Sequence, residues 1–388
     1  MNLATIPLET PPVDTIRPAT SRETPAKQRT ELGSPVPDWL DRGQIPGLDG
    51  LRAIAVTLVL MVHAEQTPGF PNWLRPISHR GAIGVDTFFV ISGFLITTLL
   101  ARELDRTGKI NLKRFYARRF WRIMPAYCAM LAAVALCQVG GKFHLLARDW
   151  IGALTYTTNF LYHPSWELGH TWSLSVEEHF YLLWPFALFA AGAIGGWRTA
   201  LGCIFGCWGL RCFIALVLPA LTSREIGAYY SALSENCTFT RLDTISAGCL
   251  LALACRNDFW RGRLDQLTRP ACLVLYFAVL CTSLTLSAYA KYHLCLSYTV
   301  NAFCISMLMW GVIRSEGLMA RILANPILTT LGIGSYSIYL WQQLFVYPKQ
   351  TAWYHAFPQN VALSLGAAAL SFWLIERPFN RLKDRMAK

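Results

Sequence analysis

Long apolar stretches separated by short polar segments dominate this chain of 388 residues from position 45 onward. Each stretch is close to the ~20 residues that a helix needs to cross a bilayer. The pattern predicts an all-α integral membrane protein with about ten transmembrane helices. The expected spans are Arg52–Phe70, Ala82–Ala101, Arg122–Gly140, Ser175–Gly196, Thr199–Pro219, Phe239–Cys255, Ala271–Ala290, His293–Ile313, Ile327–Tyr347 and Pro358–Ile375.

A further apolar piece, Trp150–Leu161, is too short to cross and is expected to be interfacial or re-entrant. Counting it as a span would reverse every later helix. The basic loop Arg256–Arg269 would then lie outside, against the tendency of basic loops to stay in the cytoplasm. Ten spans with both termini cytoplasmic is the consistent topology.

The chain is expected to divide into two parts. Residues 1–44 are rich in Pro, Thr and charges of both signs and have no periodic apolar face, which predicts a disordered cytoplasmic tail. This segment also lacks the continuous apolar core of a signal peptide and should stay attached. Residues 45–388 form the membrane domain.

Composition supports this class. Hydrophobic residues make up 54% of the chain and charged residues only 15%, against about 25% in a soluble domain. The net charge of +12 comes from basic residues in short loops, which indicates membrane topology rather than nucleic-acid binding. The 12 cysteines contain no CxxC pair and no spacing typical of metal ligands, so they are expected to be packing residues and no metal site is expected.

Ionisable residues inside apolar spans are costly and indicate function. Arg52 lies at the start of the first span and His63 lies inside it, eleven residues later. This interval places both side chains on one helix face, about 16 Å apart along the axis. Asp86 enters the second apolar run, and it is a further candidate for the site.

The most basic segment runs from Arg102 to Arg122 and carries Arg114, Arg118, Arg119 and Arg122 at helical spacing. Arginines at this place suit lipid head groups and membrane topology. They equally suit an anionic cosubstrate, since the guanidinium fork matches phosphate oxygens. Spacing alone does not decide between the two interpretations.

Glu177 and Glu178 stand at the expected outer start of the fourth span. One carboxylate there is explained by the helix dipole. Adjacent residues point about 100° apart, so at most one faces a central cavity squarely. Two carboxylates at the edge of an apolar run nevertheless favour a site.

Later polar residues are expected to be mainly structural. Arg241 and Asp243 suggest a local ion pair at the start of the sixth span. The segment Gly334–Gln343 supplies hydroxyl and amide groups suited to hydrogen bonds between helices. Glu376 and Arg377 suggest a pair that anchors the last span at its cytoplasmic exit.

Together these residues predict a reaction across the membrane. The arginines lie at the inner surface and the carboxylates at the outer one, with His63 between them. Burial favours a neutral imidazole, which can remove a proton from a hydroxyl or attack an activated acyl group itself. A nearby carboxylate (Asp86, Glu177 or Glu178) would fix the tautomer of His63.

Five motifs make the chain resemble the membrane-bound acyltransferase-3 family from Pro46 to Arg377: LDGLRAIAV with His63 completing Arg-x10-His, GVDTFFVISGFLI, FYARRFWRIMPAY, TWSLSVEEHFYLLWP and LGIGSYSIYLW. The resemblance implies transfer of an acyl group, usually acetyl, from acyl-CoA to an extracytoplasmic carbohydrate such as exopolysaccharide or lipopolysaccharide. It implies a bacterial inner-membrane enzyme in which Arg52 and His63 match the catalytic motif. The arginine segment would bind acetyl-CoA or another acyl-CoA as cosubstrate, without a permanently bound cofactor.

The chain departs from the family pattern at two positions. His179 replaces the glutamine expected after the glutamate pair, and Gln342 replaces a histidine that often follows SYSIYLW. The second departure leaves His63 as the leading catalytic residue. Some relatives carry a fused esterase-like domain, so this chain is expected to act alone or with a separate periplasmic acyl-transfer partner.

Two alternatives stay open. One is a proton-coupled transporter of an anionic solute, which would use Arg52, His63 and the carboxylates as a relay. Broken helices and paired halves would favour it, and the sequence indicates neither. The other is acylation of a small hydroxylated molecule.

Overall fold

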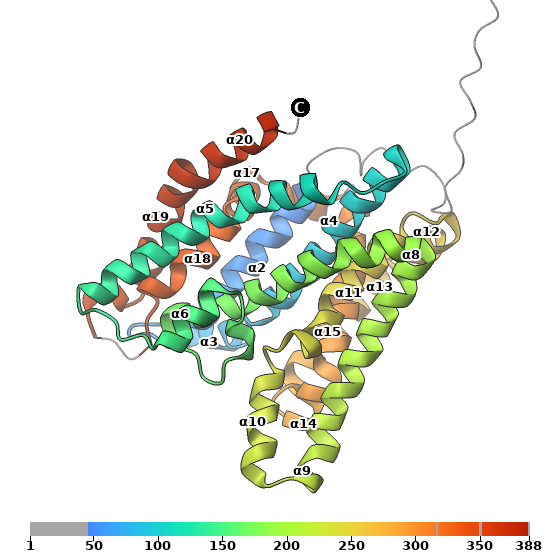
Figure 1. The fold of residues 1–388 in the computed structure, drawn as a ribbon. Coiled ribbons are helices and arrows are strands. Elements are labelled where there is room, and N and C mark those ends of the chain that lie inside the picture. Colours follow the sequence, from blue (N-terminus) through green and yellow to red (C-terminus); the bar gives the residue numbers. More distant parts are fainter. Residues whose placement is uncertain (1–45, 316, 349–350, 387–388) are drawn as a thin grey trace, which may run out of the picture.

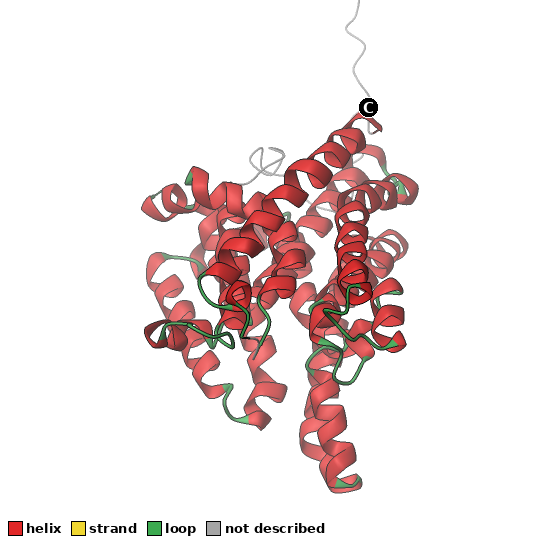
Figure 2. Ribbon diagram, turned by 90° about the vertical axis from the view of Figure 1, so that its left-hand side faces the viewer, coloured by secondary structure: helices red, strands yellow, loops and turns green. Residues whose placement is uncertain are grey.

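A computed structural model of the protein describes residues 46–315, 317–348 and 351–386 (Figure 1). Within these ranges the chain forms helices and loops and no strand (Figure 2), which confirms the all-α class. The expected tail, residues 1–44, lies outside the described residues.

The N-terminal half is built from four longer helices and several short ones. The bounds are α2 (Pro46–Ala64), η1 (Asn72–Leu74), α3 (Arg75–Ser78), α4 (Ile83–Thr107), α5 (Leu112–Val139), α6 (Ala147–Leu154), η2 (Thr158–Phe160), α7 (Trp166–Gly169) and α8 (Thr171–Cys212). Helix α8 is bent at Gly192, which has a positive φ of 60°. Glycine populates this region without steric cost, so the helix axis can change direction there.

The C-terminal half contains more breaks. Its elements are η3 (Phe213–Val217), α9 (Leu218–Leu221), α10 (Arg224–Ser234), α11 (Thr238–Ala254), α12 (Asp258–Leu267), α13 (Pro270–Leu286), α14 (Ala290–Tyr292), η4 (His293–Ser297), α15 (Tyr298–Arg314), α16 (Leu318–Leu323), α17 (Pro326–Ile333), α18 (Ser335–Phe345), η5 (Trp353–His355), α19 (Gln359–Ser371), η6 (Phe372–Glu376) and α20 (Arg377–Met386). The second half of α8, with α9, α10 and α14, forms an arm that extends from the rest of the molecule (Figure 1).

Six helical segments of the described chain are long and apolar enough to cross a membrane, and a bent pair of helices makes a seventh. They are Gly47–Ala64, Asn72–Thr107, Leu112–Val139, Gly195–Leu221, Arg224–Ala254 and Ala290–Arg314, with the pair Asp258–Leu267 and Pro270–Leu286 bent by 73°. A multi-pass membrane protein is therefore supported. The count of ten is not confirmed, and the orientation of the termini stays a prediction.

The difference in count has a physical origin. The expected span Ile327–Tyr347 is divided at Gly334 into α17, of 8 residues, and α18, of 11 residues. The helix of the last expected span is not broken, since α19 continues through the π-helical η6 into α20. Apolar composition predicts membrane contact at Ile327–Tyr347, but it does not reveal that the helix breaks there.

The piece Trp150–Leu161 forms part of the eight-residue helix α6 and the short turn η2. Eight residues rise about 12 Å, far less than the thickness of a bilayer core. This segment does not cross as a single helix, as its length predicts. Its interfacial or re-entrant placement stays a prediction.

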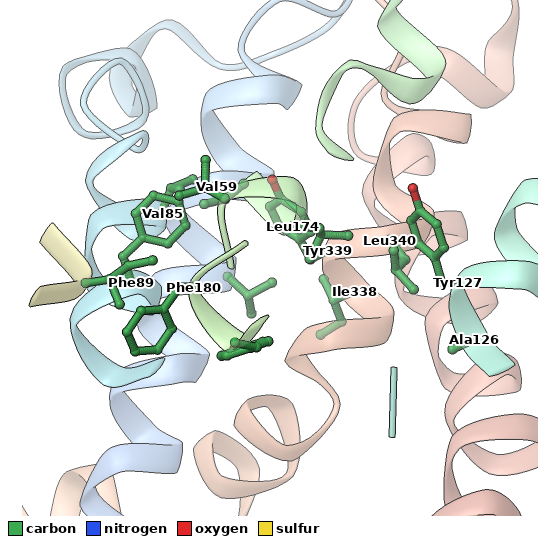
Figure 3. Close-up of a cluster of buried hydrophobic side chains, with 14 of the residues drawn as sticks. Val59, Val85, Phe89, Ala126, Tyr127, Leu174, Phe180, Ile338, Tyr339 and Leu340 are labelled. Atoms are coloured by element: carbon green, nitrogen blue, oxygen red, sulfur yellow. The ribbon is translucent and has the colours of Figure 1, made fainter. Parts of the chain in front are cut away.

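Helix α4 packs on both of its sides. One side joins a core with α2, α5, α8 and α18, in which Phe89, Leu174 and Ile338 are buried (Figure 3). The other side joins a second core with α11 and α15, in which Phe94 and Trp310 are buried. Helix α4 thereby connects the two apolar cores of the described chain.

The crossing of α4 and α11 is close because a glycine lies on each helix. A methyl group at Gly93 would overlap the carbonyl oxygen of Ile245, and one at Gly248 would overlap the carbonyl oxygen of Val90. Small residues at such contacts let helix backbones approach each other in membranes.

We predict that Gly93→Ala lowers stability by about 1–3 kcal/mol, because the methyl group must push α11 away. The measurement is the temperature at which the detergent-solubilised protein loses its monodisperse gel-filtration peak. The matched control is Gly202→Ala, since no atom lies within 4 Å of a Cβ at Gly202. Equal melting temperatures of the two variants would show that the glycine contact does not determine how closely α4 and α11 pack.

Candidate active site

A cavity of about 760 Å³ lies between α2, α4, α5, α8, α18 and the C-terminal helices. Its wall carries six arginines and four carboxylates. The arginines are Arg52, Arg102, Arg119, Arg122, Arg377 and Arg381, and the acids are Asp49, Glu177, Glu178 and Glu376. The excess of guanidinium groups favours an anionic ligand, and phosphate oxygens match their paired donors.

Arg52 is held in the wall by its own helix. Its Nη1 donates to Asp49 Oδ1 at 3.1 Å, one turn earlier on α2. Gly332 of α17 packs against the carbonyl oxygen of Asp49, where any side chain would overlap it. Because α2 is continuous from Pro46 to Ala64, the prediction that Arg52 and His63 share one helix is confirmed.

Of the four arginines that the sequence singled out at helical spacing in the basic segment, two reach the cavity and two do not. The Arg119 guanidinium lies 4.6 Å from the ring centre of Tyr181, an attractive cation–π distance, and Arg122 lies in the same wall. Arg118 is directed to Glu103 at 3.8 Å. Arg114 is likewise not among the lining residues.

The glutamate pair enters the same cavity as the arginines. Glu177 accepts hydrogen bonds from Ser92 of α4 at 2.7 Å and from Tyr181 at 3.2 Å, and Glu178 lines the wall beside it. The sequence placed the carboxylates and the arginines at opposite surfaces. This placement is wrong, since the two sets line one cavity, with Glu177 in the second turn of α8.

Asp86 has a different environment. It forms a buried ion pair with Arg241 of α11, and the Arg241 guanidinium lies 3.9 Å from the ring centre of Tyr298. Asp243 pairs instead with Arg211 at 2.6 Å. The expected Arg241–Asp243 pair is therefore wrong, because each residue finds its partner on another helix.

Neither Asp86 nor His63 is among the residues that line the cavity. The expected anchor pair at the last span also differs, since Glu376 accepts a hydrogen bond from Ser337 and Arg377 lies over the ring of Trp373. Both residues of this pair face the cavity.

Three helices of the cavity wall continue to a second polar region, which we call the histidine end: His63, Trp166, His170, Gln342 and Gln343. His63 follows Arg52 on α2 at a rise of about 16 Å, and Gln342 and Gln343 lie in the turn of α18 after the wall residue Tyr339. The His63 ring lies 5.4 Å from Trp166, edge to face, with the Gln342 amide beside it.

Tyr339 connects the cavity to the histidine end. It lines the cavity, and its hydroxyl donates to the carbonyl oxygen of His170 at 2.8 Å and lies 2.6 Å from Ser173 Oγ. His179, the other departure from the family pattern, lies elsewhere and makes a 2.7 Å hydrogen bond with Thr238.

Sequence reasoning missed several residues of these two regions. They are Arg102, Arg377 and Arg381 in the cavity and His170 and Gln343 at the histidine end. Arg377 and Arg381 stand four residues apart on α20, a spacing that places them on one face and was available as a signal. Among the described residues, no group of three His, Cys, Asp or Glu side chains is arranged to hold a metal ion.

Comparison with known proteins identifies the class. A family model described as an acyltransferase domain matches residues 45–376. The chain therefore belongs to this acyltransferase family, and the resemblance seen in its motifs is confirmed. No solved structure matches the chain.

Two relatives illustrate the match. The protein named "Putative O-acetyltransferase SACOL0978" of Staphylococcus aureus (strain COL) is 30% identical over 374 residues, with 87% of this chain covered. The O-acetyltransferase OatA of Staphylococcus aureus (strain NCTC 8325 / PS 47) is 29% identical over 362 residues, again with 87% of the chain covered. The chain spans 57% of the length of each relative.

We predict that Asp86→Asn destabilises the protein by about 3–5 kcal/mol, because Arg241 is left as a buried charge without its counter-ion. Thermal unfolding in detergent measures this, with the surface variant Glu225→Gln on α10 as control. A variant that melts like the wild type but has lost activity would instead assign Asp86 the catalytic role expected from the sequence.

Proposed function

We propose that the protein is an O-acyltransferase that moves an acyl group, acetyl in the first place, from cytoplasmic acyl-CoA to a hydroxyl of an extracytoplasmic glycan such as exopolysaccharide or lipopolysaccharide. The observation that carries this proposal is the arginine-rich cavity, whose helices α2, α8 and α18 continue to His63 and its neighbours. A small hydroxylated molecule is the variant acceptor.

The cavity suits the donor. Coenzyme A carries several phosphate charges, and Arg52, Arg119 and Arg122 offer forked donors on two helices. The acids of the wall leave an excess of two positive charges among the ten charged lining residues. Such an excess attracts a polyanion without holding it irreversibly, as turnover requires.

His63 suits the reaction. A neutral imidazole either takes the proton of the acceptor hydroxyl or attacks the thioester carbonyl itself, and in both cases the thioester C–S bond breaks and the thiolate leaves as protonated CoA. The side chain beside His63 is the Gln342 amide rather than a carboxylate. In this proposal the Gln342 amide orients the His63 ring, while Glu177 and Glu178 partly neutralise the arginines of the cavity.

The relatives named O-acetyltransferases support acetyl as the acyl group. The apolar helices support placement in the bacterial inner (plasma) membrane, where a cytoplasmic donor and an extracytoplasmic acceptor meet. The acyl group then passes to the glycan directly or through a separate periplasmic partner.

One observation favours the alternative of a proton-coupled transporter. The helix break at Gly334 lies directly before the cavity residue Ser335, and broken helices beside a charged cavity are typical of secondary transporters. The acyltransferase family membership favours the enzyme over this alternative.

We predict that the purified protein in liposomes releases CoA from labelled acetyl-CoA when a surface-glycan extract is present, and that His63→Ala lowers this rate by about 100-fold or more, since a general base or nucleophile is lost. Labelled product and free thiol are measured together. Wild-type protein that releases no CoA from any short acyl-CoA would favour the transporter. Full activity of the variant would exclude His63 from catalysis.

A second prediction distinguishes an arginine that lines the cavity from one that does not. Arg122→Gln should raise the KM for acetyl-CoA about tenfold or more, because a charge-assisted contact to phosphate contributes about 1.5–3 kcal/mol. Arg118→Gln should leave KM within about twofold, since Arg118 does not line the cavity and is directed to Glu103. Equal effects of the two substitutions would indicate that the basic segment binds acyl-CoA outside the cavity.

A further inference from the structure

The histidine end contains a second imidazole that the motifs do not single out as catalytic. His170 lies in the turn between α7 and α8, and only 3% of its surface is exposed. It lies four residues after Trp166, whose ring contacts His63, and its charge would act on His63 directly. Two imidazoles from distant parts of the chain thus share one buried region.

The hydrogen bonds of His170 define its tautomer. Gln343 Oε1 accepts the backbone N–H of His170 at 3.3 Å and lies 2.8 Å from its Nδ1. An amide oxygen can only accept, so Nδ1 carries the proton and Nε2 carries a lone pair. Nε2 is buried and has no hydrogen-bond partner in the described part of the chain.

Two further buried polar atoms at the histidine end also lack a partner among the described residues, namely Nδ1 of His63 and Oε1 of Gln342. Burying one such group without a hydrogen bond costs about 1–3 kcal/mol. Because the Gln342 amide lies beside His63, Nε2 of His170 is the clearest of the three, and its lack of a partner among the described residues indicates a site for a polar ligand. Ser173 and Glu177 of α8 line the cavity, and His170 precedes Ser173 by three residues at the start of the same helix.

Resting on the proposed function, we infer that His170 is the base that takes the proton of the acceptor hydroxyl through Nε2, and that His63 is the residue that receives the acyl group. Gln343 is the positioning residue that keeps the proton on Nδ1 of His170. The ligand of the site is therefore a hydroxyl group presented between the two imidazoles.

Acyl transfer through His63 and His170 takes three steps. The unprotonated nitrogen of His63 attacks the thioester carbonyl, the C–S bond breaks, and the thiolate takes the imidazole proton and leaves as CoA. The acceptor oxygen then bonds to the acyl carbon while its proton moves to Nε2 of His170, and the bond from acyl carbon to His63 breaks. The imidazolium of His170 returns that proton to His63, and both rings are again neutral.

The deciding variant is His170→Asn. The asparagine amide supplies an N–H group that can donate to Gln343 in place of Nδ1. Asparagine has no counterpart of Nε2, so the substitution removes the base. We expect the first-turnover burst of CoA release to persist while the steady rate of glycan acylation falls by about 100-fold or more. The control His144→Asn makes the same change in an exposed loop residue and should leave both quantities unchanged.

Two results would overturn the inference. One is a His170→Asn variant that acylates glycan within about threefold of the wild-type rate. The other is a folded variant that has lost the burst together with the steady rate. Wild-type protein that releases no CoA would overturn the proposed function instead, and this is seen before any variant is made.

A second pair of variants covers the case in which His170→Asn does not fold. Gln343→Met removes the acceptor of the Nδ1 proton, while Gln343→Glu keeps one. We expect the methionine variant to lose about tenfold or more of the steady rate with the burst retained, and the glutamate variant to exceed the methionine variant. Equal rates of the two would overturn the positioning role and, with it, the inference.

Discussion

The packing of α4 against α11 determines where the reactive groups of this protein lie. Two glycine contacts bring the backbones together, and the Asp86–Arg241 ion pair joins the same two helices within the apolar interior. The Arg241 charge is further surrounded by the rings of Phe89, Trp172 and Tyr298. Because α4 also contributes Ser92 to the wall of the cavity, a shift of α4 would move the hydrogen-bond donor of Glu177.

The cavity solves a problem that the bilayer imposes on charged residues. A lone arginine within a span is costly, but an arginine beside carboxylates and ligand phosphates is not. Six arginines and four carboxylates in one wall neutralise each other in part. Their remaining positive charge is the portion that an anionic ligand can compensate, so the electrostatics of the cavity favour the binding of an anion.

The sequence predicted the features that depend on spacing along one helix and missed those that depend on packing between helices. The shared helix of Arg52 and His63 followed from an eleven-residue interval, and the all-α class followed from the apolar stretches. The Asp86–Arg241 pair joins residues 155 positions apart, and no local pattern encodes it. The break at Gly334 was likewise invisible, because hydropathy measures composition rather than helix continuity.

The surroundings of His63 explain why Gln342 can stand where the family pattern often has a histidine. A carboxylate beside His63 would favour the charged ring, and a charged ring cannot attack a thioester. An amide orients the ring without adding charge, and this chain places Gln342 beside His63 and Gln343 at His170. The two neighbouring glutamines thus orient the imidazoles without adding a charge, while burial disfavours the charged rings. The second imidazole is supplied from the turn before α8 rather than from α18.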